Sequence, residues 1–350
     1  MSSSAGSDIQ VGGPSQKQRI VVICPGRGSY TSETLGYLKK YQSKYAEFIS
    51  DIDERRRQIG EPTISELDNR EKFSPGIHTR GEHASALIYA CSYCDFMNID
   101  RDKYEIVAIC GNSMGWYLAL AFGGALDWAG SFQLIQTMGS MMKQEIVGGQ
   151  IIYPAVDDNW QPDGVRQRAV YAKLEELASH EGRLGQAYIS IWLGGFIVIG
   201  GDKAGLDFML KGLPRTGDYP FQLINHAAFH TPLLFETSKR ALEMISPDIF
   251  HKPHTPLIDG RGHIWQPYST GQQELYEYTL GHQVYAPYDF TTSITVALKE
   301  FMPDQLWLLG PGASLGGAIG QTLVKNRWKK FMSKNDFKER SKEFLTLSGV

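Results

Sequence analysis

The stretch AICGNSMGWYLALAF, residues 108–122, places a serine between two glycines, after an apolar run and before a helical pattern. The run from Tyr104 to Cys110 predicts a buried strand, and a helix is expected from about Met114. A strand that turns sharply through G-x-S-x-G into a helix exposes the serine Oγ at the end of a sheet, near the positive end of the helix. Ser113 is therefore a candidate nucleophile, although small residues in a tight turn also serve packing.

The segments around this turn alternate between strands and helices. Residues 19–24 (RIVVIC) predict another buried strand, followed by the turn PGRGSY and an amphipathic helix, and a further helix is expected over 83–97. Such alternation indicates a parallel α/β sheet covered on both faces. From Gln150 to about Ile224 the order becomes strand, helix, strand, strand, helix, strand. This order predicts a ferredoxin-like βαββαβ subdomain inserted into the larger body.

The composition limits the classes of function. A net charge of −3 argues against nucleic acid as a partner, and no apolar run approaches the ~20 residues needed to span a membrane. The start of the chain has no stretch resembling a signal peptide, so a disordered tail and a cytoplasmic location are expected. Cys91 and Cys94 form a C-x-x-C without a second ligand pair, so we interpret them as buried helix residues and expect no metal site.

A serine nucleophile needs a base, and the chain has nine histidines. His230, in NHAAFHTPLLF, follows the inserted subdomain in a loop of small apolar residues just ahead of a helix. His226 lies four residues earlier in the same loop and competes with it on composition alone. Because no carboxylate lies near either residue in the sequence, a backbone carbonyl would have to hold the imidazole in the correct tautomer.

Five motifs in register carry a family resemblance. PGRGSY, GNSMGWYLAL, FIVIGGDKAGLDFML, AFHTPLL and LLGPGASLGGAIG resemble, in the same order, the PGQGSQ, GHSLGE, NSPxQxVISG, AFHS and EVGPG motifs of malonyl-CoA:acyl carrier protein transacylases. The acyltransferase domains of fatty acid and polyketide synthases belong to the same group. The resemblance covers roughly residues 19–323. It implies an α/β-hydrolase-like parallel-sheet body with the ferredoxin-like insertion.

We expect the following domain boundaries. The ranges are a tail (1–17), a large subdomain (18–145 with 222–324), a small subdomain (146–221) and a basic C-terminal segment (325–350).

The resemblance also implies a ping-pong acyl transfer (an EC 2.3.1 activity) in fatty acid or polyketide biosynthesis. Ser113, activated by His230, would take an acyl group from acyl-CoA and pass it to the phosphopantetheine thiol of an acyl carrier protein. The backbone N–H groups of Arg27 and Met114 would form the oxyanion hole, and the carbonyl at about Leu308 would orient the histidine. No permanently bound cofactor is implied, since the CoA thioester is a substrate and phosphopantetheine belongs to the carrier.

The sequence departs from the family pattern around the expected acyl pocket. Asn112 and Trp116 replace the histidine and glutamate of the elbow, and Trp192 and Leu193 align near the asparagine and serine of NSP. Met138 stands where malonyl-specific members carry the arginine that binds the substrate carboxylate. Because a buried carboxylate without a partner costs several kcal/mol, this pocket favours a neutral acyl group over malonyl. Another cation could replace the lost arginine, the candidates being Arg27, Arg80 and Arg261.

Two other functions stay open on the same scaffold. The first is an acyl hydrolase that removes acyl groups from carrier proteins, and the second is a non-catalytic homologue that only binds the carrier or its acyl chain. The basic segment from Lys325 to Lys342 is a candidate contact for an acidic carrier protein, although a solvated amphipathic face is the simpler account of it. Trp328 and Phe331 are expected to pack this segment against the body.

Overall fold

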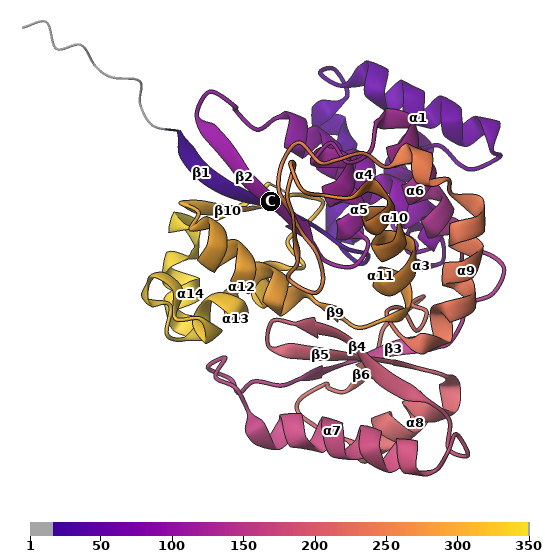
Figure 1. The fold of residues 1–350 in the computed structure, drawn as a ribbon, viewed down its shortest axis with the longest axis vertical. Coiled ribbons are helices and arrows are strands. Elements are labelled where there is room, and N and C mark those ends of the chain that lie inside the picture. Colours follow the sequence, from indigo (N-terminus) through magenta and orange to yellow (C-terminus); the bar gives the residue numbers. More distant parts are fainter. Residues whose placement is uncertain (1–16, 349–350) are drawn as a thin grey trace, which may run out of the picture.

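The computed structural model describes residues 17–348, which form two sheets with helices around them (Figure 1). The predicted tail, except for Lys17, lies outside the described residues. Within residues 17–348, no helix is both long enough and apolar enough to cross a membrane.

The large sheet has the strand order β11-β10-β1-β2-β7-β8, and all neighbouring strands are parallel except β7 and β8. Its two central strands, β1 and β2, are the predicted strands at residues 19–24 and 104–110, and β1 is buried from Ile20 to Cys24. A strand buried on both faces is apolar along its whole length because helices cover both sides of the sheet. The strands are β1 (Gln18–Cys24), β2 (Tyr104–Gly111), β7 (Leu257–Ile258), β8 (Ile264–Trp265), β10 (Gln305–Leu308) and β11 (Leu345–Leu347).

Helices cover this sheet on both faces, with α4, α5 and α6 on one side and α12 and α13 on the other (Figure 1). Those before the small sheet are α1 (Ala46–Gln58), α2 (Ile64–Asp68), α3 (Pro75–His78), α4 (Gly81–Met97), α5 (Gly115–Phe122) and α6 (Trp128–Ser140). Those after it are α9 (Phe235–Met244), α10 (Gln272–Glu277), α11 (Gln283–Tyr285), α12 (Phe290–Phe301), α13 (Gly316–Lys325) and α14 (Lys334–Arg340).

Helix α4 is buried almost all round, and it contains both cysteines of the C-x-x-C. Cys91 and Cys94 are free and buried. Burial raises the pKa of the Cys94 thiol to about 12 and the pKa of Cys91 well above its usual value. A thiol that stays protonated is a poor nucleophile and metal ligand. The two cysteines therefore act as small apolar core residues.

The second sheet confirms the predicted βαββαβ order, and with it the fold class of a parallel α/β body carrying a ferredoxin-like insertion. Its strand order is β6-β3-β5-β4-β9, antiparallel except for the last pair. The insertion runs through β3 (Gly149–Pro154), α7 (Gly164–Ser179), β4 (Ala187–Leu193), β5 (Phe196–Gly201), α8 (Lys203–Gly212) and β6 (Phe221–Gln222), and α7 and α8 cover its outer face (Figure 1). The strand β9 (Tyr288–Asp289) is supplied by the later part of the chain.

The C-terminal segment is more closely integrated than a basic amphipathic tail would be. Phe331 is buried, as expected, and Trp328 is partly buried. Beyond α14 the chain returns to the large sheet, where β11 pairs with β10. A strand as short as β11 has too little periodicity to be recognised from sequence.

The turn between β2 and α5 is possible only with glycine on both sides of the serine. A Cβ on Gly111 would collide with the backbone of Gly115, and one on Gly115 would collide with the carbonyl oxygen of Cys24. The elbow thus packs directly against the end of β1.

We expect Gly115→Ala to lower the free energy of unfolding by about 1–3 kcal/mol, the usual cost of overpacking. Urea denaturation followed by circular dichroism measures it. The matched control is Gly317→Ala on α13, where the added methyl group meets open space. The control should be neutral or raise stability by up to about 1 kcal/mol. Equal stability of the two variants would contradict the packing described for the elbow.

Candidate active site

Ser113 occupies a strained backbone position between the end of β2 and the start of α5. Its φ of 55° lies in the left-handed region, which costs a non-glycine residue about 1–3 kcal/mol. Strain of this kind is characteristic of a nucleophile elbow, in which the turn holds the serine side chain out of the sheet.

His230 lies beside Ser113 although 117 residues separate them in the sequence. The Ser113 Oγ and the His230 Nε2 are 2.7 Å apart, and His230 is 3% exposed. On the other side of the ring, Nδ1 lies 2.6 Å from the backbone carbonyl oxygen of Gln283. A carbonyl can only accept, so Nδ1 carries the proton and Nε2 is free to accept from the serine hydroxyl. The structure therefore brings together the predicted pair in the tautomer that a general base needs.

The carbonyl that orients the histidine belongs to Gln283, so the expectation of Leu308 was wrong. The Leu308 carbonyl accepts a hydrogen bond from the backbone N–H of Ser348, at the junction with β11. Gln283 instead begins the short helix α11, directly after a π-helical turn over Tyr278–His282. Carbonyls at the end of so short a helix lack intrahelical donors and can accept from elsewhere.

The side chain of Gln283 fixes the same carbonyl against the elbow. Its Nε2 donates to the backbone carbonyl of Ser113 at 3.1 Å, and its Oε1 accepts from the Tyr117 hydroxyl at 2.9 Å. One residue thus contacts His230 through its backbone and Ser113 through its side chain. This arrangement couples the position of the base to that of the nucleophile.

Burial keeps the candidate base neutral. It lowers the pKa of His230 to about 4, against the opposing effect of the Gln283 carbonyl. The competing histidine, His226, contacts the Gln150 side chain at 2.8 Å, and no contact with Ser113 is found among the described residues. The ambiguity between the two histidines is therefore resolved in favour of His230.

Arg27 and Met114 both line the cavity that holds Ser113. Within residues 17–348, neither of their backbone N–H groups has a hydrogen-bond acceptor. Unpaired backbone donors beside a nucleophile are the elements of an oxyanion hole.

The cavity is mainly apolar. Of the predicted acyl-pocket residues, only Met138 lines it, together with residues that the sequence did not point to. These additional lining residues are Ser85, Tyr117, Gly139, Met141, Phe229, Leu234, Gln283 and Val284.

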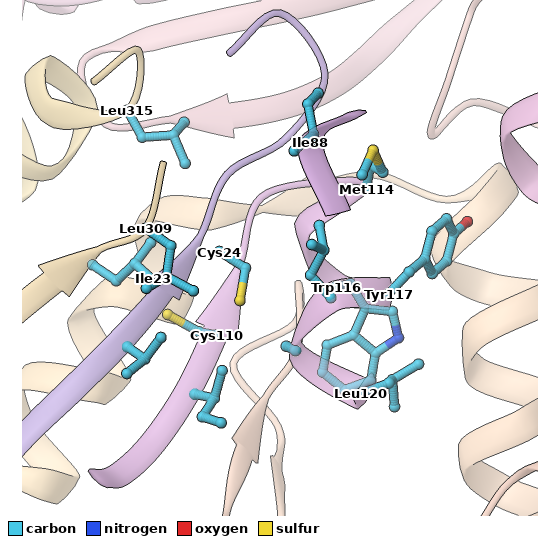
Figure 2. Packing of buried hydrophobic residues seen from close by; sticks show 14 of the residues in the cluster. Ile23, Cys24, Ile88, Cys110, Met114, Trp116, Tyr117, Leu120, Leu309 and Leu315 are labelled. Atoms are coloured by element: carbon cyan, nitrogen blue, oxygen red, sulfur yellow. The ribbon is translucent and has the colours of Figure 1, made fainter. Parts of the chain in front are cut away.

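The predicted pocket roles of Asn112 and Trp116 were wrong. Trp116 is fully buried in the core below the elbow, beside Leu120 (Figure 2), and its Nε1 donates to the Thr279 hydroxyl at 3.0 Å. Asn112 is buried at the turn, where its carbonyl accepts from the Gly115 N–H at 2.8 Å. Their neighbours in the chain face the cavity, but these two side chains pack elsewhere.

Trp192 and Leu193 also lie outside the cavity lining. Successive residues of a strand face opposite sides of the sheet. Trp192 packs on the core of the small subdomain, and its Nε1 contacts the Tyr171 hydroxyl on α7 at 3.3 Å. Leu193 packs against the core of the large body.

The three candidate replacement cations occupy different places. Arg261 pairs with Asp259 at 2.6 Å and does not line the cavity, whereas Arg80 lines a neighbouring groove. Arg27 lines the cavity itself, with its Nη2 donating to the carbonyls of Thr79 and Asn225 at 3.0 and 2.9 Å. Burial lowers its pKa to about 10, so it stays protonated at neutral pH.

We expect the His230 imidazole to titrate near pH 4 rather than near 6.5, because the buried ring is costly to charge. The ring should therefore be neutral throughout the neutral range and gain its proton only as the pH falls through about 4. NMR titration of the ring Cε1–H, assigned by its loss in His230→Ala, measures this directly. A midpoint above 6 for His230 would contradict the buried, neutral state.

Known proteins resemble this chain in structure. No protein-family model and no curated protein matches the sequence. A malonyl-CoA:ACP transacylase from Synechocystis sp. PCC 6803 has a TM-score of 0.71 and 15% identity, covering 95% of this chain and 97% of that chain. An acyl carrier protein S-malonyltransferase from Vibrio cholerae has a TM-score of 0.70 and 16% identity, covering 95% and 96%.

A third solved structure is a complex of a type II PKS acyl carrier protein with its malonyl-transacylase. It has a TM-score of 0.69 and 18% identity, covering 87% of this chain and 93% of that chain. Each match extends over nearly the whole of both chains. At these identities, the similarity shows that the chain shares the fold of these transacylases.

Proposed function

We propose that this protein is an acyltransferase that moves an acyl group from a CoA thioester to the phosphopantetheine thiol of an acyl carrier protein. The observation that carries the proposal is the 2.7 Å contact between Ser113 and His230, with the imidazole tautomer set by Gln283. The similarity to transacylases, one of them solved with its carrier protein, supports the choice of acceptor.

In the first half-reaction, His230 Nε2 takes the proton of the Ser113 hydroxyl while Oγ attacks the thioester carbonyl carbon. The N–H groups of Arg27 and Met114 stabilise the oxyanion, a contribution of about 10²–10³ in rate for one donor. The C–S bond then breaks, and His230 returns the proton to the leaving thiolate. In the second half-reaction, His230 takes the proton of the carrier thiol as the sulfur attacks the acyl-serine carbonyl carbon. The ester C–O bond then breaks, and His230 returns the proton to the Ser113 Oγ.

Hydrolysis is the second candidate function, because water can replace the thiol in the second half-reaction. A non-catalytic homologue is the third. The largely apolar lining around the acyl-serine favours transfer, since it offers few partners for an attacking water.

Acylation of Ser113 is the first test. We expect incubation with acetyl-CoA to add one acetyl group, detected by intact mass, and holo-acyl carrier protein to remove it as acyl carrier. Ser113→Ala should abolish the adduct, and His230→Ala should slow its formation by about 10²–10⁴. Ser179→Ala, which removes a hydroxyl at the end of α7, is the control. Free acetate instead of acyl carrier would indicate hydrolysis, and no adduct with acetyl-, malonyl- or longer acyl-CoA would contradict both enzymatic functions.

We further propose that the pocket prefers a neutral acyl group. Met138, Met141 and Leu234 contribute apolar side chains to the lining, and methionine is a flexible, apolar wall. Among residues 17–348, Arg27 is the one cation of this lining. Its Nη2 donates to two backbone carbonyls, and its guanidinium lies 5.2 Å from the Phe229 ring centre. The two backbone carbonyls thus already occupy its Nη2.

The variant Met138→Arg tests this preference. A new charge-assisted hydrogen bond is worth about 1.5–3 kcal/mol, so the ratio of kcat/KM for malonyl-CoA to that for acetyl-CoA should rise by about ten- to a hundredfold. Met138→Gln has a similar size without the charge and should leave the ratio within about threefold of its original value. A wild-type protein that uses malonyl-CoA in preference to acetyl-CoA would contradict the proposed neutral specificity.

A further inference from the structure

The loop that carries the candidate base, residues 226–231, lies directly on the sheet of the inserted subdomain. A Cβ on Gly200 of β5 would lie 2.7 Å from the Thr231 side chain, so only glycine lets the loop approach the strand this closely. The Ala228 N–H donates to the carbonyl of Val147, just ahead of β3, at 2.8 Å. The inserted subdomain therefore supports the loop from one side.

The backbone of His230 is strained and is held in place by hydrogen bonds. Its φ of 58° lies in the left-handed region, which is costly for a residue other than glycine and persists only where the surrounding contacts hold it. The His230 N–H donates to the Val284 carbonyl at 3.0 Å. The carbonyl of the preceding residue, Phe229, accepts from the Ser190 hydroxyl on β4 at 2.8 Å. The single peptide unit between Phe229 and His230 is thus held at both of its polar ends.

The Phe229 carbonyl also sets the direction of the hydrogen bonds behind Ser190. Because a carbonyl can only accept, the Ser190 hydroxyl donates to it and must itself accept from Gln150 Nε2, which is 2.6 Å away. The same Nε2 lies 3.4 Å from the Phe229 carbonyl oxygen. The other end of the amide, Oε1, then faces His226 Nδ1 at 2.8 Å, so this nitrogen carries the proton. Three donors therefore point one way, toward the backbone carbonyl ahead of the candidate base.

This chain of hydrogen bonds is buried between the two subdomains of the fold. Ser190 is fully buried and Gln150 is 2% exposed. Burial lowers the pKa of His226 to about 3, with the charge of Arg27 acting in the same direction, so the imidazole stays neutral. A buried polar group that loses its partner gains no water in exchange, and such a network is rigid only while every member is paired. His226 thus fixes the Gln150 amide rather than serving Ser113.

We propose that two residues of the inserted subdomain, Gln150 and Ser190, are positioning residues for the candidate base, His230. Both act through the Phe229 peptide, which fixes the point from which the imidazole extends. This inference rests on the proposed function, since it takes His230 as the base of Ser113. The inserted subdomain thereby controls the reactivity of a serine that belongs to the other subdomain.

A fluorophosphonate tests this inference, because it needs only a nucleophilic serine and neither CoA nor a carrier protein. The Ser113 Oγ displaces fluoride from phosphorus while His230 takes the hydroxyl proton, and intact mass follows the adduct. We expect Ser190→Ala to lower kinact, the rate constant of the bound reagent, by about three- to tenfold, the effect of one hydrogen bond. The reagent's KI should change by less than about twofold, since the side chains that line the cavity are retained.

A second variant and a matched control separate positioning from stability. Gln150→Leu should lower kinact as Ser190→Ala does, and the double variant should stay within about twofold of the slower single variant, because both residues act in one chain. The control is Tyr153→Phe, which removes a buried hydroxyl that donates to the Pro214 carbonyl at 2.9 Å in the same subdomain. It should lower Tm about as much as Ser190→Ala and leave kinact within about twofold of the wild-type value.

The outcomes separate the inference from the function on which it rests. Unchanged kinact in a folded Ser190→Ala protein would overturn the inference, and so would an equal fall in Tyr153→Phe, which would show a general structural effect. Effects of Gln150→Leu and Ser190→Ala that multiply in the double variant would also overturn it. If Ser113 reacts with the reagent but takes no acyl group from any CoA thioester, the proposed function is overturned, while the falls in kinact still support the inference. An unreactive Ser113 in the wild-type protein would overturn both.

Discussion

The hydrogen bond from His230 Nδ1 to the carbonyl of Gln283 determines what the rest of the site can do. It leaves Nε2 unprotonated toward Ser113, and it does so without a carboxylate. A carboxylate in this place would favour the imidazolium, whereas a carbonyl within a buried site leaves the ring neutral, with its pKa lowered to about 4. The base is therefore available over the whole neutral range, at the cost of a weaker tendency to hold the proton during the reaction.

This bond depends on segments from three distant parts of the chain. The elbow comes from the β2–α5 turn, His230 from the loop after the inserted subdomain, and Gln283 from the helix that follows the π-helical turn. The Gln283 side chain joins the first and third of these through its bonds to Ser113 and Tyr117. Small displacements of the π-helical turn would consequently move base and nucleophile together, which protects their 2.7 Å separation.

The sequence predicted those parts of the site and fold whose residues are contiguous in the chain. The elbow could be predicted because its strand, glycines and helix are contiguous, and the inserted subdomain because its elements follow a regular order. His230 stood out through its loop of small residues. Leu308 was a wrong assignment because the orienting group is a backbone carbonyl, which any residue type can supply. The sequence before Gln283 shows only an irregular pattern, and a π-helical turn has no sequence signature strong enough to be recognised. Gln283 therefore could not be identified from the sequence.

The pocket was predicted less well for a related reason. Trp116 and Asn112 adjoin Ser113 in the sequence, yet a tight turn sends successive side chains in different directions, and both are buried away from the cavity. Trp192 and Leu193 were assigned to one surface although neighbours in a strand face opposite sides. Met138 alone was placed correctly, because α6 presents it toward the elbow.

Apolar and cationic side chains occupy different parts of the site. Around Ser113 the lining is apolar and the histidine is neutral, so a neutral acyl group can enter without losing a solvated charge. Positive charge begins at Arg27 and continues outward to Arg80 and Lys143. The apolar lining and the cationic side chains therefore meet at Arg27, beside the candidate nucleophile.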